Sequence, residues 1–308
     1  MTTILFTHEA CLDHDPGPHH PECPARLAAV LAALEGPDFA ALERRTASAA
    51  SDAEIARVHP MGHIERILGM IPPAGRTMID PDTALSPGSR DAALRAAGAV
   101  VAAVDAVVGG EAANAFCAVR PPGHHAEPLR SMGFCLFNNI AIGAAHARAA
   151  HGLRRVAVVD FDVHHGNGTQ AFFFDDPDYL YCSTHQWPLY PGTGAPQETG
   201  AAGNIVNAVL PPGADGAAFR AVFDAQVIPA LDAFAPDFLM VSAGFDAHED
   251  DPLAGLRLAT EDYGWATGRL REAAKRHCGG RLVSALEGGY DLKSLGDSAA
   301  AHVLALMA

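Results

Sequence analysis

Short runs of apolar residues alternate along the chain with longer stretches in which apolar residues recur every three or four positions. Apolar runs of strand length and β-branched content occupy residues 4–6, 115–119, 156–159, 179–184, 205–210, 238–243 and 282–286. Helical periodicity covers residues 24–35, 61–70, 89–108, 138–151, 217–234, 260–277 and the chain from 293 onward, with shorter helical turns near 51–54 and 169–174. This alternation predicts an α/β fold with a mostly parallel sheet, formed by residues 1–308 as a single domain.

Local signals at helix starts add detail to this prediction. Pro24 suits the first turn of a helix, and Ser51 with Glu54 forms a capping box. Arg26 lies in a first helical turn, where the helix dipole disfavours a cation, so we expect a partner outside the helix to hold it. Residues 71–89 are rich in Pro, Gly, Asp and Thr, and a loop of that length is usually functional or disordered.

Composition is typical of a globular protein. Of the 308 residues, 49% are apolar and 19% charged, which is enough apolar content to bury a large core. The best candidate for a membrane span, residues 96–108, is too short and includes Asp105. The first residues have neither the basic start nor the apolar stretch of a signal peptide. We therefore expect a cytoplasmic enzyme with no membrane segment.

Net charge and the numbers of cysteine and histidine residues limit the partners and the metal sites that we expect. The formal charge of −15 at pH 7 repels nucleic acid phosphates, so we expect no direct nucleic acid binding, whereas lysine-bearing peptides or polyamines would be tolerated. The six cysteines contain no Cys-x-x-Cys pair, which argues against a disulfide framework and against a thiolate zinc site. Histidine, the commonest metal ligand, occurs sixteen times.

The most informative segment is residues 155–168, where a run of β-branched apolar residues ends in carboxylates and imidazoles. Side chains alternate along a strand, so Asp160, Asp162 and His164 are expected to point to one face. Asp162 and His164 could bind one cation there, with Asp160 beside them as a supporting partner. The alternative is a strand end with solvated polar residues.

Other strand ends help to decide between these two interpretations. The pair His124 and His125, then Asp246, and finally Tyr290 each follow a predicted strand at its carboxyl end. In parallel α/β folds ligands bind outside these ends, so distant segments converge on one crevice. This convergence favours a metal site over a solvated strand end.

Four motifs carry a resemblance to a known family. They are Arg120-Pro-Pro-Gly-His-His-Ala126 with Gly133-Phe-Cys135, Asp160-Phe-Asp-Val-His-His-Gly166, Ser242-Ala-Gly-Phe-Asp246 and Glu287-Gly-Gly-Tyr290. In order and spacing they resemble the zinc-dependent histone deacetylase family, with its class II-like bacterial histone deacetylase-like amidohydrolases and acetylpolyamine amidohydrolases. The resemblance implies an arginase-like open α/β domain with a central, mostly parallel eight-stranded sheet flanked by helices.

The resemblance also implies a set of metal ligands. Asp162, His164 and Asp246 would bind zinc, and three protein ligands with room for water are typical of a catalytic site. Iron or cobalt would fit the same ligands. Related ureohydrolases hold a second metal through an aspartate at the position of Gly166, so we expect one catalytic ion. Relatives also bind potassium, which here would involve the backbone of Asp160, Asp162 and His164 together with Ser183 and Thr184.

Catalytic roles follow from the same resemblance. His125 would be the general base and acid, and His124 an electrostatic partner oriented by Asp160. Tyr290 would donate a hydrogen bond to the developing oxyanion. The ordinary alternative for the two histidines is a proline-braced turn packed against the sheet. Where many relatives have aspartate this chain has Asn167, which cannot stabilise an imidazolium by charge, so we expect a lower pKa for His125 than with an aspartate partner.

The walls of the substrate tunnel are the last feature that the resemblance addresses. Phe134, next to Gly133, and Tyr190 match the aromatic pair that lines the acyl-lysine tunnel of the family, although core aromatics would give the same pattern. Leu253 stands where polyamine-selective relatives can carry a glutamate, which weakens a polyamine interpretation. Either Asp80 or Asp82 would accept a hydrogen bond from the substrate backbone, the alternative being a solvated turn.

Three functions follow as hypotheses. The first is a zinc amidohydrolase that removes acetyl or other acyl groups from lysine side chains of proteins or peptides. The second keeps this chemistry and acts on acetylpolyamines or other small amides, xenobiotic amides among them. The third is a catalytically inactive module that binds acyl-lysine or metal, against which the presence of His124, His125 and Tyr290 counts. The sequence leaves two questions open: whether the protein forms a homo-oligomer, and whether the loop from His14 to Cys23 covers the site.

Overall fold

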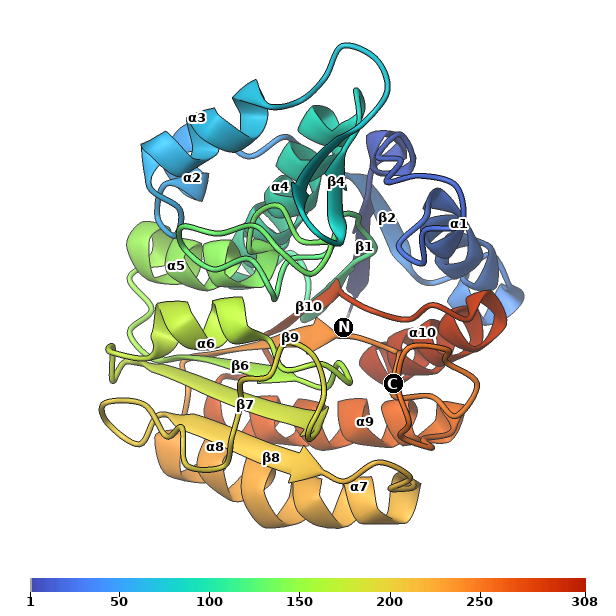
Figure 1. Cartoon of the computed structure of the whole chain (residues 1–308). Helices are drawn as coiled ribbons and strands as arrows, with labels where there is room; N and C mark the ends of the chain where they lie inside the picture. Colours follow the sequence, from blue (N-terminus) through green and yellow to red (C-terminus); the bar gives the residue numbers. More distant parts are fainter. Residues whose placement is uncertain (1) are drawn as a thin grey trace.

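The computed structural model describes residues 2–308 and is built around one eight-stranded sheet (Figure 1). Every neighbouring pair of strands in this sheet is parallel, and the strand order is β2-β1-β5-β10-β9-β6-β7-β8. The strands are β1 Thr3–Thr7, β2 Glu43–Thr46, β5 Asn114–Cys117, β6 Val156–Asp160, β7 Tyr179–Gln186, β8 Ile205–Leu210, β9 Phe238–Ala243 and β10 Leu282–Leu286. The α/β fold with eight parallel strands is therefore confirmed.

Helices cover both faces of the sheet (Figure 1). On one face lie α4, α5 and α6, and on the other α1 and α7 to α10. Their bounds are α1 Pro24–Ala33, α2 Asp52–Ile55, α3 Met61–Gly69, α4 Ser89–Val108, α5 Asn139–His151, α6 Asn167–Phe173, α7 Gly216–Val222, α8 Ile228–Phe234, α9 Thr260–His277 and α10 Leu292–Met307. Short 3₁₀ turns occupy Glu9–Leu12 and Pro37–Phe39.

The hydrophobic core lies between the sheet and these two helix layers. All five residues of β6 and all six of β9 are buried, as expected of strands that are covered on both faces. The N-terminus of α2 carries the expected capping box between Ser51 and Glu54. Among residues 2–308 no helix combines the length and the apolar character needed to cross a membrane.

The structure corrects the sequence prediction in three places. Strand β2 was missed because its sequence, Glu-Arg-Arg-Thr, has no apolar alternation; it pairs along one side only, with β1, through backbone hydrogen bonds. The expected loop at 71–89 contains an antiparallel hairpin of β3 Thr77–Asp80 and β4 Thr83–Leu85. The helix expected over 217–234 is interrupted by a π-helical turn, Phe223–Val227, shortly before Pro229, which has no N–H to donate.

Candidate metal centre and active site

Three side chains meet beyond the carboxyl ends of β6 and β9. His164 Nδ1 lies 3.2 Å from Asp162 Oδ1 and 3.1 Å from Asp246 Oδ2, and all three residues are buried. Two ligand atoms that are each about 2.0–2.2 Å from an ion in tetrahedral geometry are roughly 3.3 Å apart. The separations and the donor types therefore fit a divalent ion held by two carboxylates and one imidazole.

Backbone groups orient the two carboxylates. Asp246 Oδ1 accepts a hydrogen bond from the Val163 N–H (2.8 Å), and Asp162 Oδ2 accepts one from the Gly288 N–H (2.8 Å). These bonds leave the opposite oxygens facing His164. A Cβ atom at Gly288 would lie 2.1 Å from Asp246 Oδ2, so only glycine allows this close approach.

The charge of this cluster also indicates a cation. Burial, together with the negative charge of Asp162, raises the pKa of Asp246 to about 7. Two buried carboxylates oppose each other's ionisation unless a cation lies between them. A divalent cation at this position would allow both to ionise.

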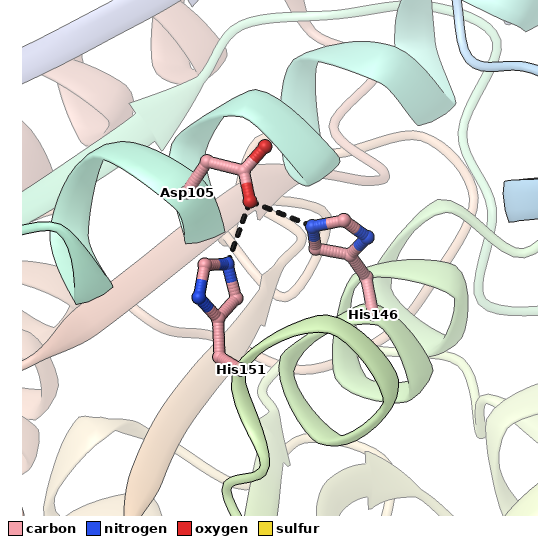
Figure 2. A group of neighbouring side chains, drawn as sticks. All are labelled: Asp105, His146 and His151. Carbon is pink, nitrogen blue, oxygen red and sulfur yellow. Dashed lines mark hydrogen bonds and ion pairs between the residues drawn. The ribbon is translucent and has the colours of Figure 1, made fainter.

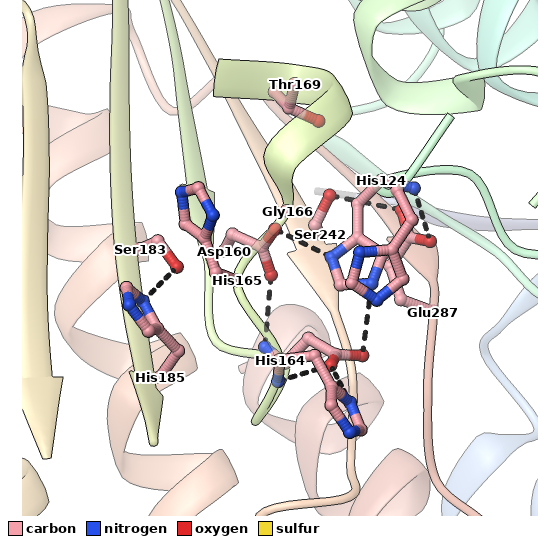
Figure 3. Close-up of polar contacts among 12 residues, drawn as sticks. His124, Asp160, His164, His165, Gly166, Thr169, Ser183, His185, Ser242 and Glu287 are labelled. Atoms are coloured by element: carbon pink, nitrogen blue, oxygen red, sulfur yellow. Dashed lines mark hydrogen bonds and ion pairs between the residues drawn. The ribbon is translucent and has the colours of Figure 1, made fainter. Parts of the chain in front are cut away.

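His124 lies beside this cluster and is held by Asp160 (Figure 3). Its Nδ1 lies 3.0 Å from Asp160 Oδ2, an oxygen that also accepts a hydrogen bond from the Tyr181 hydroxyl (2.9 Å). Burial disfavours a charge on His124, but the carboxylates of Asp162 and Asp160 outweigh burial and raise its pKa to about 10. His124 is therefore a cation at neutral pH.

The neighbouring histidine has the opposite protonation state. Burial and the charge of His124 hold the pKa of His125 well below its usual range. Its Nδ1 lies 2.8 Å from Asn167 Oδ1, and because an amide oxygen only accepts, Nδ1 carries the proton. Asn167 is fixed in this orientation because its Nδ2 donates to Glu127 Oε1 (2.8 Å). Nε2 of His125 therefore keeps its lone pair.

Glu287 begins one of the four motifs, but the sequence analysis assigned it no role in the site. One of its oxygens accepts hydrogen bonds from the backbone N–H groups of Gly123 (2.7 Å) and His124 (3.1 Å), and the other accepts from the Ser242 hydroxyl (3.1 Å), as Figure 3 shows in part. Burial raises its pKa to about 7. The carboxylate thus fixes the turn that carries both histidines. A glutamate directly after the apolar run 282–286 was the available signal.

The expectation that a partner holds Arg26 is confirmed. Its guanidinium is fully buried, donates to Glu22 Oε1 (3.1 Å), and also donates to the carbonyl oxygens of Glu287 and Gly289. It lies 4.7 Å from the centre of the Tyr290 ring. Burial raises the pKa of Tyr290 well above its usual range, so the phenol stays protonated and can donate. Arg26 joins helix α1 to the segment that positions Tyr290.

The cluster opens into a cavity of about 180 Å³. The cavity is lined by Asp82, His125, Gly133, Phe134, His164, Tyr190, Leu253 and Tyr290. All the wall residues expected from the sequence are in this set except Asp80, whose carboxylate pairs with Arg130 at 2.9 Å. Asp82, in the hairpin turn, accepts hydrogen bonds from the Gly133 N–H (3.2 Å) and the Thr83 hydroxyl (2.8 Å), so it is not a freely solvated turn residue.

Ser183 and Thr184 lie on β7 beside the end of β6. Ser183 is paired in register with Asp160, and the Thr184 hydroxyl is 3.5 Å from the Asp160 carbonyl oxygen. The Ser183 hydroxyl contacts His185 Nδ1 at 2.9 Å (Figure 3). The two residues are thus close to the Asp160 backbone, and potassium binding stays a prediction.

Comparison with known proteins places this geometry in a family. Residues 20–306 match the model of the histone deacetylase domain. The chain is 40% identical to the histone deacetylase-like amidohydrolase of Pseudomonas aeruginosa over 94% of this chain and 81% of the relative. It is 41% identical to histone deacetylase 14, chloroplastic, of Arabidopsis thaliana over 99% of this chain and 76% of the relative.

A solved structure agrees. The crystal structure of the HDA15 HD domain superimposes with a TM-score of 0.92 at 36% identity, covering 99% of this chain and 88% of that one. The probable deacetylase of Archaeoglobus fulgidus is a further relative, 40% identical over 95% of this chain and 82% of its own length. The chain therefore belongs to the histone deacetylase family and is a hydrolase that acts on C–N bonds other than peptide bonds.

Proposed function

We propose that this enzyme removes acetyl or related acyl groups from lysine side chains of proteins or peptides. The observation that carries the proposal is the cavity, which has Phe134 and Tyr190 in its walls and leads to His125 and the carboxylate cluster. A linear apolar stem ending in an amide fits such walls, because its methylenes would contact aromatic faces while the amide reaches the polar end.

The metal ligands in this proposal are Asp162, His164 and Asp246, and the ion is zinc. When bound, zinc lowers the pKa of a water molecule and polarises the amide carbonyl. The position two residues after His164 is Gly166, which offers no carboxylate for a second ion. Iron or cobalt would be compatible with the same donors, so the ion is to be identified by elemental analysis of the purified protein.

The protein groups divide the proton transfers between them. His125 is neutral, so its Nε2 can accept the proton of the attacking water and later deliver it to the leaving amine. His124 is positively charged and stays so, which favours negative charge developing nearby. Tyr290 is protonated and donates a hydrogen bond to the oxyanion, which exists only after attack.

The second candidate is hydrolysis of an acetylpolyamine or another small amide. Asp82 in the cavity lining and the net charge of −15 would suit a cationic substrate. Leu253 counts against this candidate, because an apolar side chain in the lining offers nothing to a second ammonium group. Membership of a family of hydrolases does not support the third hypothesis, an inactive binding module.

The test is a comparison of kcat/KM for an acetyl-lysine peptide, acetylspermidine and acetylputrescine with zinc-loaded protein. Tyr290→Phe is the control for background hydrolysis. We expect the peptide to be turned over fastest, with this turnover lost in the control. Preference for either polyamine would replace the first candidate by the second, and turnover unchanged in Tyr290→Phe would refute the assigned role of the phenol.

A further inference from the structure

A second group of metal-ligating side chains lies on the face formed by α4 and α5 (Figure 2). Asp105 is in the last turn of α4, and His146 and His151 are in the C-terminal half of α5. Helices of a parallel α/β fold run antiparallel to the strands, so these helix ends lie at the edge of the sheet opposite to the candidate active site. The group is therefore separate from the site described above.

We propose that Asp105, His146 and His151 bind a divalent transition-metal ion of the zinc type. Both imidazole Nε2 atoms lie 2.7 Å from the same oxygen, Asp105 Oδ1, and the three potential ligand atoms are all within 4.8 Å of one another. Two imidazoles and a carboxylate are a donor set that zinc, nickel and copper accept. The Asp105 side chain is 52% exposed, which leaves room for water at a fourth position.

Two rigid elements hold the donors. The side chain of His146 is buried between the helices, only 6% exposed, and both helices pack closely on each other. The His151 side chain is 24% exposed and precedes Gly152, which ends the helix in a left-handed conformation. The donor atoms need to separate from 2.7 Å to roughly 3.3 Å to surround an ion, and the exposed Asp105 and the half-buried His151 can move this far.

The competing interpretation is a hydrogen-bonded triad that joins α4 to α5 without any ion. In that arrangement each imidazole donates its Nε2 proton to Asp105. The Arg57 guanidinium, which can only donate, lies 2.7 Å from His146 Nδ1 and so holds the proton of His146 on Nε2. An ion at Nε2 moves that proton to Nδ1 and requires Arg57 to withdraw.

Arg57 can leave at modest cost. It is half-buried, and none of the ion pairs found within residues 2–308 gives it a carboxylate partner. The proposal therefore predicts that Arg57 and the ion compete. Replacing Arg57 by methionine, which keeps the apolar stem and removes the donor, is expected to tighten ion binding several-fold.

The experiment counts bound zinc by equilibrium dialysis in four proteins, namely wild type, Asp105→Asn, Asp246→Asn and the double variant. We expect two ions, one, one and none. Asp91→Asn is the matched control, because it removes an exposed carboxylate from the same helix, and should retain two. His151→Ala is expected to weaken the second site at least about tenfold, as changes around metal sites commonly do.

The outcomes separate this inference from the proposed function. The second site is supported if Asp105→Asn binds one zinc ion fewer than wild type and Asp246→Asn still binds the ion at Asp105. This holds even if the proposed deacylase activity fails. Equal binding by wild type and Asp105→Asn would overturn it, as would loss of an ion in Asp91→Asn. Weaker binding by Arg57→Met would refute the competition between the guanidinium and the ion. Deacylase activity of Asp105→Asn is expected to equal that of wild type, since the site lies at the opposite edge of the sheet.

Discussion

The pairing of His125 with an amide makes a prediction about the pH dependence of catalysis. Asn167 Oδ1 accepts from His125 Nδ1 at 2.8 Å, and the pKa of His125 is well below its usual range. Asn167→Asp would place a negative charge at this position. A carboxylate stabilises the imidazolium form, so the pKa of His125 rises.

The structure determines the size of this pKa rise and shows that Glu127 would oppose it. Two opposite charges about 4 Å apart at an effective dielectric constant of roughly 20 interact by about 4 kcal/mol, and each pH unit corresponds to about 1.4 kcal/mol. Burial of the new carboxylate offsets part of this, which leaves a rise of about one to three pH units. However, the Asn167 Nδ2 atom lies 2.8 Å from Glu127 Oε1, so an aspartate at 167 would oppose a second carboxylate.

The decisive variant is therefore Asn167→Asp combined with Glu127→Gln, in which the glutamine amide donates to the new carboxylate. A general base works in its unprotonated form, so activity falls as pH drops through the pKa of His125. We expect the acid limb of kcat/KM to move to higher pH by about one to three units in the double variant. Glu127→Gln alone should leave this limb in place. An acid limb that stays or moves to lower pH in the double variant would refute the assignment of His125 as the base.

Three further predictions concern residues near the turn that carries His124 and His125. Tyr290→Phe should lower kcat by about 10² to 10³ with little change in KM, measured under saturating substrate, because the lost hydrogen bond forms only with the oxyanion. Glu287→Gln should lower kcat by about 10- to 100-fold, because a glutamine amide can accept hydrogen bonds only at its oxygen and not at its nitrogen. A kcat equal to wild type would show that the turn with His124 and His125 keeps its conformation without this carboxylate. Arg26→Met should lower the free energy of unfolding in urea by about 3 to 5 kcal/mol, since it leaves Glu22 and two carbonyl groups partly unpaired; a loss below about 1 kcal/mol would contradict this.

Sequence pattern was most informative where burial selects apolar residues along the whole length of an element. Strands β8, β9 and β10 and helices α4 and α9 have the expected bounds, because an apolar run or a helical stripe ends where burial ends. Strand β2 carries no such pattern, since it contributes backbone hydrogen bonds at a sheet edge and its side chains stay polar. The hairpin of β3 and β4 is equally short and only three-residue β4 is fully buried.

The residues of the site likewise divide into those that local sequence predicts and those that it does not. Asp162 and His164 are only two positions apart, which made their proximity predictable, but β6 ends at Asp160, so both lie in the loop beyond the strand and not on it as expected. Asp246 was placed by its position after another strand and by the resemblance. The contacts of Arg26 with Glu287 and Gly289 join residues more than 260 positions apart, and no local pattern encodes such pairs. The sequence showed only that Arg26 is out of place in a first helical turn.

The two adjacent histidines show why the surrounding charges matter more than the residue type. His124 faces Asp160 and Asp162 and is charged, whereas His125 faces the neutral amide of Asn167 and is not. The charge on His124 itself lowers the pKa of His125. The carboxylates behind His124 thus act on His125 through its neighbour, because by fixing a proton on one imidazole they help to keep the other free to accept one. An amide at 167 is consistent with this arrangement, since a carboxylate there would work against it.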